Sequence, residues 1–283
     1  MKINQLSPSG YCKGVENAIN TLERVAKNPK YPKPIYVLGE IVHNSFVTKH
    51  FNTLGVINIT DDFESAISNI NSGTIVITAH GISKNIVNIL KLTSLTIVNT
   101  TCPYVTLVHK KIEKMIENGY SCLYIGHIGH PETNGVLGID TNIKLVTNDN
   151  VDSIIVSSNE NIFVSNQTTF SYFEIEDIVK KLKLKKPNLL FDNDICDEST
   201  KRQLAVKNQD SCDLTIIVGD KKSSNSIRLF ETSKNAGFIT IMISSFKDLD
   251  LSHLKGVKTI NIIGGASTPQ LLIDEIINHI KDL

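Results

Sequence analysis

The stretch TTCPYVTLVHKK (residues 100–111) places a cysteine directly before a predicted helix. Thr101 is a favourable N-cap residue, and Pro103 suits the first position of a helix. Two other cysteines stand in the same setting, in the stretches GYCKGVENAI (residues 10–19) and DICDESTKRQLAV (residues 194–206). The three lie 90 and 94 residues apart in the sequence: Cys12, Cys102 and Cys196. This regular spacing predicts three similar structural units within one chain.

Short apolar runs alternate with helical stretches along the whole chain. The runs are PIYVLG, TIVITAH, LTIVN, CLYIGH, NIFVSN, LTIIVG, ITIMIS and KTINIIGG. Apolar residues from Val15 to Ala26 follow the i, i+3, i+4 spacing of an amphipathic helix. Strands that alternate with helices are typical of α/β folds with mostly parallel sheets. We predict three α/β units around a pseudo-threefold axis, covering residues 1–100, 101–190 and 191–283.

Each of these cysteines is followed by two polar segments at predicted strand ends. The first segment comes 27 to 31 residues after the cysteine and the second 66 to 71 residues after it. In chain order the segments contain His43, His80, His130, Thr168, Ser223 and Ser267. Ligands bind at the carboxyl ends of parallel strands, so we expect the segments to converge on one central site. Their neutral or weakly basic donors suit a phosphate group.

Composition excludes several classes of function. The 283 residues include 29 Lys plus Arg and 29 Asp plus Glu, and this balance gives no support for binding to nucleic acid or to a membrane surface. No apolar run reaches the roughly 18 residues of a membrane span, and no signal-type segment is seen. We expect a cytoplasmic protein whose five cysteines form no structural disulfides. No Walker lysine motif and no GxGxxG occurs, so nucleotide binding is weakly supported.

Three thiolates at helix starts suit a soft metal ion or an iron–sulfur cluster. A cubane cluster held by three cysteines leaves one iron open to a substrate oxygen. A zinc ion on the same thiolates is the competing metal, and three buried structural cysteines are the alternative without a metal. Cys122 and Cys212 stand at strand entries and have no counterpart in the first unit. We interpret both as small core residues.

Glu132 follows His130-Pro131 and is the one acid inside the proposed site. A carboxyl group in an enclosed polar pocket is a candidate proton donor. The structural alternative is an acid at a helix N-terminus, where the helix dipole favours it. The remaining histidines are predicted to be structural: His50, His109, His127, His253 and His279.

Taken together, these segments resemble the 4-hydroxy-3-methylbut-2-enyl diphosphate reductase family. The matching segments occur in the family's order and cover nearly the whole chain: GYCKGVENAI, EIVHN, TAHGIS, TTCPYVTLVHKK, IGHIGHPETNGVLG, NQTTFS, DICDESTKRQLAV, KKSSNS and GGASTP. The combination of GHPE, AHG and TCP with SSNS and GAS-P is specific. The resemblance implies a trefoil of three α/β domains around a 4Fe–4S cluster.

In this family the cluster ligands would be Cys12, Cys102 and Cys196, with one iron site left open. The diphosphate would be held by His43, His80, His130, Ser223, Ser224, Asn225 and Ser267. Thr168 and Glu132 would lie near the substrate hydroxyl, with Glu132 in a proton relay. The implied reaction removes that hydroxyl as water and gives isopentenyl and dimethylallyl diphosphate, the last step of the methylerythritol phosphate route. Ferredoxin or flavodoxin would supply the electrons.

The chain departs from the family pattern in three places. Asp197 and Glu198 replace small or apolar residues, Asn99-Thr100-Thr101 replaces Asp-Ala-Thr, and Ile139 follows Gly138 where a Gln is common. Added negative charge beside a cluster would lower its reduction potential.

Two alternative functions stay open on the sequence alone. Quinolinate synthase, another enzyme with a three-cysteine cluster, performs condensation rather than reduction, and the GHPE and SSN segments argue against it. An iron–sulfur sensor without catalysis would leave Glu132 and the donor segments unexplained.

Overall fold

The computed structural model describes residues 1–157 and 159–283, and all eight predicted apolar runs form strands in it. These strands are β2 (Ile35–Leu38), β4 (Thr74–Ile77), β5 (Thr96–Asn99), β6 (Tyr120–Ile125), β8 (Asn161–Asn166), β10 (Leu214–Val218), β11 (Thr240–Ile243) and β12 (Thr259–Gly264). Four further strands were not predicted: β1 (Lys2–Gln5), β3 (Val56–Ile59), β7 (Lys144–Val146) and β9 (Leu190–Phe191). All four lie at sheet edges.

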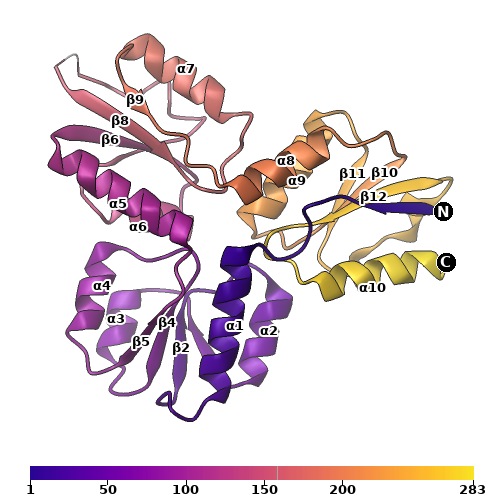
Figure 1. Cartoon of the computed structure of the whole chain (residues 1–283), viewed down its shortest axis with the longest axis horizontal. Helices are drawn as coiled ribbons and strands as arrows, with labels where there is room; N and C mark the ends of the chain where they lie inside the picture. Colours follow the sequence, from indigo (N-terminus) through magenta and orange to yellow (C-terminus); the bar gives the residue numbers. More distant parts are fainter. Residues whose placement is uncertain (158) are drawn as a thin grey trace. The chain divides into compact units, whose positions relative to one another are not determined.

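Helices separate nearly all of the strands, as predicted (Figure 1). They are α1 (Lys13–Lys27), α2 (Ser45–Thr53), α3 (Phe63–Ser68), α4 (Lys84–Lys91), α5 (Pro103–Glu117), α6 (Pro131–Leu137), α7 (Ile175–Lys185), α8 (Asp197–Lys207), α9 (Ser224–Asn235) and α10 (Gln270–Lys281), with 3₁₀ helices η1 (Phe246–Asp248) and η2 (Leu251–Leu254). The helices α1, α5 and α8 each begin at the residue after a cysteine of the predicted repeat.

Three four-stranded parallel sheets share one strand order. The first sheet runs β3-β2-β4-β5, the second β7-β6-β8-β9, and the third β11-β10-β12-β1. Numbered along the chain within each sheet, with β1 as the fourth strand of the third, the order is 2-1-3-4 every time. The predicted α/β repeat is therefore confirmed at the level of topology.

The N-terminal strand completes the last sheet. Strand β1 pairs in parallel with β12, with Lys2 opposite Thr259 and Gln5 opposite Ile262. Residues of the first predicted unit thus supply the fourth strand of the third sheet. As a result, each repeat cysteine occupies the same place, between the fourth strand of a sheet and the helix that follows it.

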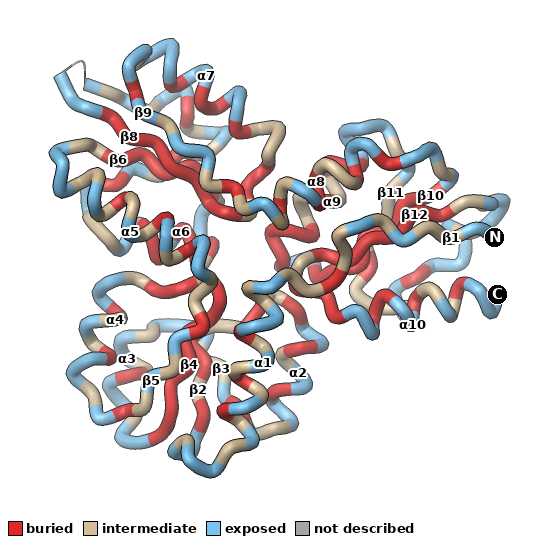
Figure 2. Tube along the Cα trace, viewed as in Figure 1, coloured by how far each residue is buried: buried red, intermediate tan, exposed pale blue. Residues whose placement is uncertain are grey.

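Each sheet is covered by helices on both faces, and alternating residues of a strand serve the two faces. In the second sheet, Leu123 and Ile125 pack in a cluster with residues of α7, whereas Cys122 and Tyr124 pack in another with residues of α5 and α6. In the third sheet, α10 covers one face and α8 with α9 the other (Figure 1). The central strands are accordingly buried along their length (Figure 2).

The chain divides into two compact units. The terminal unit contains the third sheet and comprises Met1–Glu16, Val42–Lys49 and Cys196–Leu283. The central unit contains the first and second sheets and comprises Asn17–Ile41 and His50–Ile195. Cys12 and Cys196 belong to the terminal unit and Cys102 to the central unit.

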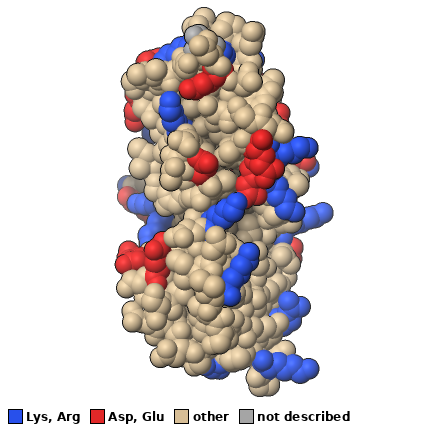
Figure 3. Space-filling view, turned by 90° about the vertical axis from the view of Figure 1, so that its left-hand side faces the viewer, with Lys and Arg blue, Asp and Glu red and all other residues tan. Residues whose placement is uncertain are grey.

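Positive and negative side chains are interspersed on the face drawn in Figure 3, in keeping with the equal numbers of acidic and basic residues. Among residues 1–157 and 159–283, no helix is both long enough and apolar enough to span a bilayer.

The core of α1 gives a direct test of this packing. Leu22 is fully buried, so Leu22→Ala is expected to lower the free energy of unfolding by about 2–5 kcal/mol through lost burial and a residual cavity. The matched control is Leu92→Ala, at a leucine that is 89% exposed, and it is expected to change stability by less than about 0.5 kcal/mol. Urea unfolding followed by circular dichroism measures both; equal losses would contradict the assigned core.

Candidate functional site

The predicted polar segments follow the first and third strands of their sheets. His43, His130 and Ser223 follow the first strands β2, β6 and β10, and His80, Thr168 and Ser267 follow the third strands β4, β8 and β12. In the order 2-1-3-4, the first and third strands are neighbours, and in the first and second sheets the chain leaves them toward opposite edges. The carboxyl ends of parallel strands at such a reversal are where sheets of this kind bind ligands.

In the central unit the structure brings Glu132 and Thr168 together. Glu132 lies in the first turn of α6 and is only 1% exposed. Its Oε1 accepts from the Thr168 backbone N–H at 2.7 Å, and its Oε2 pairs with the Thr168 hydroxyl at 2.8 Å. The carboxyl group is thus part of a closed network rather than a solvated helix-end acid.

Burial raises the pKa of Glu132 to about 7, because desolvation penalises the charged form. The Thr168 N–H, the Thr168 hydroxyl and the Tyr124 hydroxyl oppose this rise by donating to the carboxylate, while the nearby charge of Asp194 adds to it. A carboxyl group that titrates near neutrality can both hold and release a proton at the pH of the cell.

His130 is the N-cap of α6, and its Nδ1 accepts from the Glu132 backbone N–H at 3.2 Å. In a neutral imidazole the other ring nitrogen then carries the hydrogen, so Nε2 is a hydrogen-bond donor. The His80 ring lies edge-on to the His130 ring, with centroids 5.5 Å apart. Two imidazoles are therefore adjacent in the central unit, and His130 is fixed in the tautomer that suits an anionic oxygen.

In the terminal unit the predicted donors also gather. The Ser267 hydroxyl lies 3.2 Å from the Ser223 Oγ and 3.2 Å from the His43 carbonyl oxygen. Ser223 caps α9 by accepting from the Ser226 N–H, and Ser224 and Asn225 form the first turn of that helix. Five of the predicted residues thus lie around the start of α9 and the adjoining loop: His43, Ser223, Ser224, Asn225 and Ser267.

Hydrogen bonds connect these donors to two of the cysteines. The Asn225 Oδ1 accepts from the Ala266 N–H at 2.9 Å, and the Cys12 N–H donates to the Ala266 carbonyl at 3.1 Å. The Cys196 thiol in turn donates to the Ser199 Oγ at 3.3 Å. In the central unit the Cys102 N–H makes the corresponding bond to the Ala79 carbonyl, beside His80, at 2.9 Å. Cys12 and Cys102 are therefore tied in the same way to the loop after a third strand.

The five cysteines are free of disulfides, and Cys122 is the buried one among them. The interpretation of Cys212 as a core residue is wrong, because Cys212 is partly exposed. Cys12, Cys102 and Cys196 are partly exposed and directly precede helices, where the dipole favours a thiolate. The sequence favoured Thr101 as the N-cap of α5, but the N-cap is Cys102. The Thr101 hydroxyl donates to the Asn99 Oδ1 instead. Cys122 is buried in the second sheet, and desolvation raises the pKa of its thiol to about 11. A thiol of that kind stays protonated.

The additional acid at Glu198 is compensated. Its Oε2 accepts from the Arg202 guanidinium at 2.6 Å, and Arg202, 1% exposed, also donates to the Gly10 carbonyl at 2.8 Å. The same side chain therefore attaches α8 to the loop that carries Cys12. Asp197, the other unusual acid after Cys196, lies exposed in the first turn of α8.

Four residues of these networks were not predicted as site residues. The Tyr124 hydroxyl donates to Glu132 Oε1 at 3.2 Å, and Gln167 Oε1 accepts from the His127 N–H at 3.1 Å. Asp194 accepts from the Ser165 hydroxyl at 2.8 Å and pairs with Lys111 at 2.5 Å. Asp220 accepts from the Ser45 N–H at 2.9 Å and so holds the loop of His43. The sequence signal for Asp220 was its position directly before KKSSNS. Tyr124 lies inside an apolar strand, and no sequence signal marked it as a site residue.

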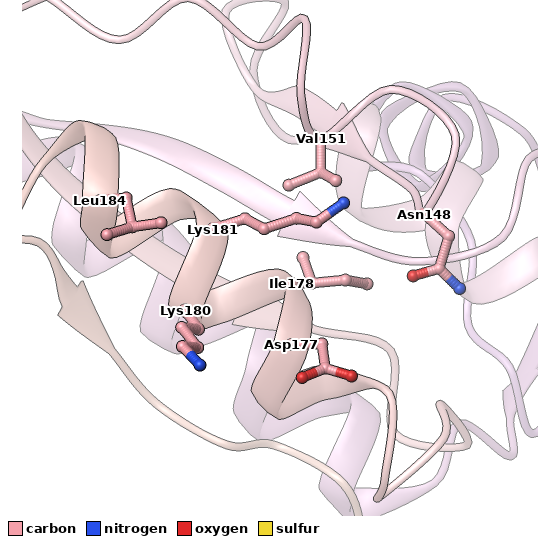
Figure 4. A pocket seen from close by; sticks show the side chains of 7 residues that line it. All are labelled: Asn148, Val151, Asp177, Ile178, Lys180, Lys181 and Leu184. Carbon is pink, nitrogen blue, oxygen red and sulfur yellow. The ribbon is translucent and has the colours of Figure 1, made fainter.

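A surface hollow elsewhere in the central unit contains none of the predicted residues (Figure 4). It lies between α7 and the loop that follows β7, and Lys181 at its rim pairs with Asp152 at 2.8 Å. Its lining residues are Asn148, Val151, Asp177, Ile178, Lys180, Lys181 and Leu184. This mixture of aliphatic and ion-paired side chains is that of an ordinary helix surface.

Relatives of known name match over almost the full length. The 4-hydroxy-3-methylbut-2-enyl diphosphate reductase of Geobacillus sp. (strain WCH70) is 37% identical over 286 residues, covering 99% of this chain and 90% of the relative. The protein of the same name from Bacillus subtilis (strain 168) is also 37% identical, with 99% and 91% covered.

Two solved structures are similar to this one. The E-1-hydroxy-2-methyl-but-2-enyl-4-diphosphate reductase from Plasmodium falciparum has a TM-score of 0.92 and 33% identity, covering 98% of this chain and 87% of that one. A structure of (E)-4-hydroxy-3-methyl-but-2-enyl diphosphate reductase, the terminal enzyme of the non-mevalonate pathway, has a TM-score of 0.71 and 29% identity over both full chains. The sequence pattern of the family described as LytB protein matches residues 3–281, and the chain belongs to that family.

Proposed function

We propose that the chain is a 4-hydroxy-3-methylbut-2-enyl diphosphate reductase. The reaction replaces the hydroxyl of the (E)-4-hydroxy substrate by hydrogen: one C–O bond breaks, one C–H bond forms, and two electrons and two protons are consumed as water leaves. Isopentenyl and dimethylallyl diphosphate are the products. The observation that carries the proposal is the buried Glu132–Thr168 pair, a proton donor poised near neutrality in a chain of the LytB family.

Cys12, Cys102 and Cys196 are the proposed ligands of a 4Fe–4S cluster with one open iron. Their chemistry fits this group, since all three are partly exposed thiols at helix starts, whereas Cys122 is buried and remains protonated. When bound, such a cluster supplies electrons and an iron that acts as a Lewis acid on the substrate oxygen. The pairing of Glu198 with Arg202 leaves Asp197 as the main additional charge at the start of α8.

The proposed diphosphate ligands are the donors of both units. Ser223, Ser224, Asn225 and Ser267 offer hydroxyl and amide groups around the start of α9, where backbone N–H groups and the helix dipole also favour an anion. The imidazoles of His43, His80 and His130 complete the set, with His130 held as an Nε2–H donor. Thr168 is proposed to lie near the substrate hydroxyl.

Glu132 and Thr168 are the proposed proton relay. Glu132 Oε2 lies 2.8 Å from the Thr168 hydroxyl, which is within reach for proton transfer. A neutral Glu132 would donate to Thr168, and the Thr168 hydroxyl would pass its own hydrogen to the departing oxygen. Burial keeps the acid neutral for a useful fraction of the time at pH 7.

The electron donor is proposed to be a ferredoxin or flavodoxin, since the reaction consumes two electrons and the chain contains no nucleotide-binding fingerprint among its motifs. Quinolinate synthase activity and a purely sensing role are the competing functions. Anaerobic turnover of the hydroxylated diphosphate with a chemical reductant separates all three, because only the reductase forms the two C5 diphosphates. Absence of both products from iron-loaded protein would refute the proposal.

Removal of single thiols tests the cluster ligands. Cys12→Ser, Cys102→Ser and Cys196→Ser are each expected to lose cluster or activity, because each removes one thiolate. Cys122→Ser and Cys212→Ser are the matched controls and are expected to keep the cluster with at most modest destabilisation. Iron content and visible absorbance after anaerobic reconstitution report the outcome; a brown, iron-loaded protein also excludes zinc. Full loading in all three of the first variants would overturn the assignment.

Loss of an imidazole tests the diphosphate site. His43→Ala and His80→Ala are each expected to weaken substrate binding about ten- to a hundredfold, because a hydrogen bond to a charged group contributes about 1.5–3 kcal/mol. Cluster loading is expected to be unchanged. His253→Ala, at an exposed histidine of η2, is the control. Titration of the loaded protein with substrate measures affinity, and wild-type affinity in both variants would remove these loops from the phosphate site.

Replacing the acid by an amide tests the relay. Glu132→Gln keeps the shape of the side chain but removes its proton, so turnover is expected to fall about 10²–10⁴-fold while substrate still binds. If Glu132 were only a helix-end acid, the variant would lose at most about 1 kcal/mol of stability and keep its turnover. Steady-state rates and a substrate-induced change in the cluster spectrum distinguish the two.

The pH dependence follows from the same group. The pKa of Glu132 lies at about 7, so the acid is neutral below this pH and ionised above it. Turnover that depends on the neutral acid is therefore expected to be highest below pH 7 and to fall about tenfold per pH unit well above it. Glu132→Gln is expected to abolish this limb of the rate profile; a limb that persists would belong to another group.

A further inference from the structure

The two oxygens of the Glu132 carboxyl group have different partners. Oε1 receives two donors, the Thr168 backbone N–H at 2.7 Å and the Tyr124 hydroxyl at 3.2 Å. Oε2 faces the Thr168 side-chain hydroxyl at 2.8 Å. A carboxyl oxygen offers two acceptor positions, so both positions of Oε1 are filled.

The environment of Tyr124 keeps its hydroxyl protonated, so that it remains a hydrogen-bond donor. It lies on β6, its side chain is fully buried, and its ring packs in the cluster formed with α5 and α6. Burial, with the adjacent charge of Glu132, raises the pKa of the phenol well above its ordinary value. The ring also contacts Gly126, where an added Cβ would lie 3.1 Å from the Tyr124 Cε1.

We propose that Tyr124 is a positioning residue for proton transfer: by occupying Oε1 of Glu132 together with the Thr168 N–H, it confines the transferable proton to Oε2, the oxygen that faces the Thr168 hydroxyl. This rests on the proposed function, in which Glu132 supplies that proton. Without the phenol, Oε1 regains a free acceptor position, and the proton can reside on the oxygen that does not face the relay.

Other charged or titratable groups around Glu132 come from several elements. His130 caps the same helix, Asp194 lies after β9 and pairs with Lys111 of α5, and His109 of α5 contacts Gly135 of α6. The carboxyl oxygens of Glu132 accept from the Thr168 N–H, the Thr168 hydroxyl and the Tyr124 hydroxyl. Removal of the phenol therefore changes the Glu132 hydrogen bonds selectively.

Tyr124→Phe keeps the ring and its packing and removes only the hydroxyl. The loss of a donor to the carboxylate is expected to raise the pKa of Glu132 by about one to two pH units, as for a typical hydrogen bond to a charged group. The high-pH limb of the turnover profile is expected to move by the same amount. Turnover on the plateau below it is expected to fall, because the proton then also occupies Oε1, while KM stays unchanged. Tyr120→Phe, on the same strand and away from Glu132, is the control and is expected to leave both unchanged.

Direct observation of the carboxyl group separates this proposal from the relay itself. Isotope-edited infrared spectroscopy of the iron-loaded protein follows the protonated Glu132 carbonyl band, identified by its absence in Glu132→Gln. A titration midpoint that is the same in Tyr124→Phe and wild type would overturn the role of Tyr124. Normal turnover in Glu132→Gln would instead overturn the relay, and with it any effect of Tyr124 on the rate.

The double variant supplies the remaining control. In a Glu132→Gln background, Tyr124→Phe is expected to cause no further loss of turnover, because the proton that it positions is gone. A further loss of the same size as in the wild-type background would show that Tyr124 acts through general packing and would refute the proposal.

Discussion

The neighbouring position of the first and third strands in each sheet is the constraint on which the candidate site depends. In the first and second sheets the connections of these two strands also leave toward opposite edges. The loops at their carboxyl ends are therefore adjacent and are not covered by a crossover. Glu132 and Thr168 follow these strands in the second sheet, and Ser223 and Ser267 in the third, which is why residues tens of positions apart share hydrogen bonds.

Burial then determines the pKa of the carboxyl group that these loops enclose. Glu132 begins a short helix above the second sheet, and in water its carboxyl group would be ionised at neutral pH. Enclosure raises its pKa to about 7, and donors from Thr168 and Tyr124 limit the rise. Desolvation also raises the pKa of the Cys122 thiol, to about 11. This thiol therefore stays protonated and unreactive at neutral pH.

Two further side chains hold the loops of the proposed site in place. Asp220 binds the backbone after His43, and Arg202 joins α8 to the loop of Cys12 while neutralising Glu198. Burial of the Asp220 carboxyl raises its pKa, but the Lys222 and Ser45 N–H groups outweigh this and keep its pKa low. Asp220 thus remains a charged acceptor. Such residues fix the geometry of the donors without contributing to a motif.

The sequence by itself determined the repeat and the central strands, and it supplied most of the residues of the proposed site. Runs such as LTIIV are mostly apolar because central strands are buried on both faces, and each cysteine of the repeat precedes a helix. The edge strands β1 and β3 were missed because KINQ and VINI are partly exposed and carry polar residues. Only the tertiary structure decided that β1 completes the third sheet and that the Tyr124 hydroxyl reaches Glu132. Both depend on contacts between separate segments of the chain, which the local sequence does not encode.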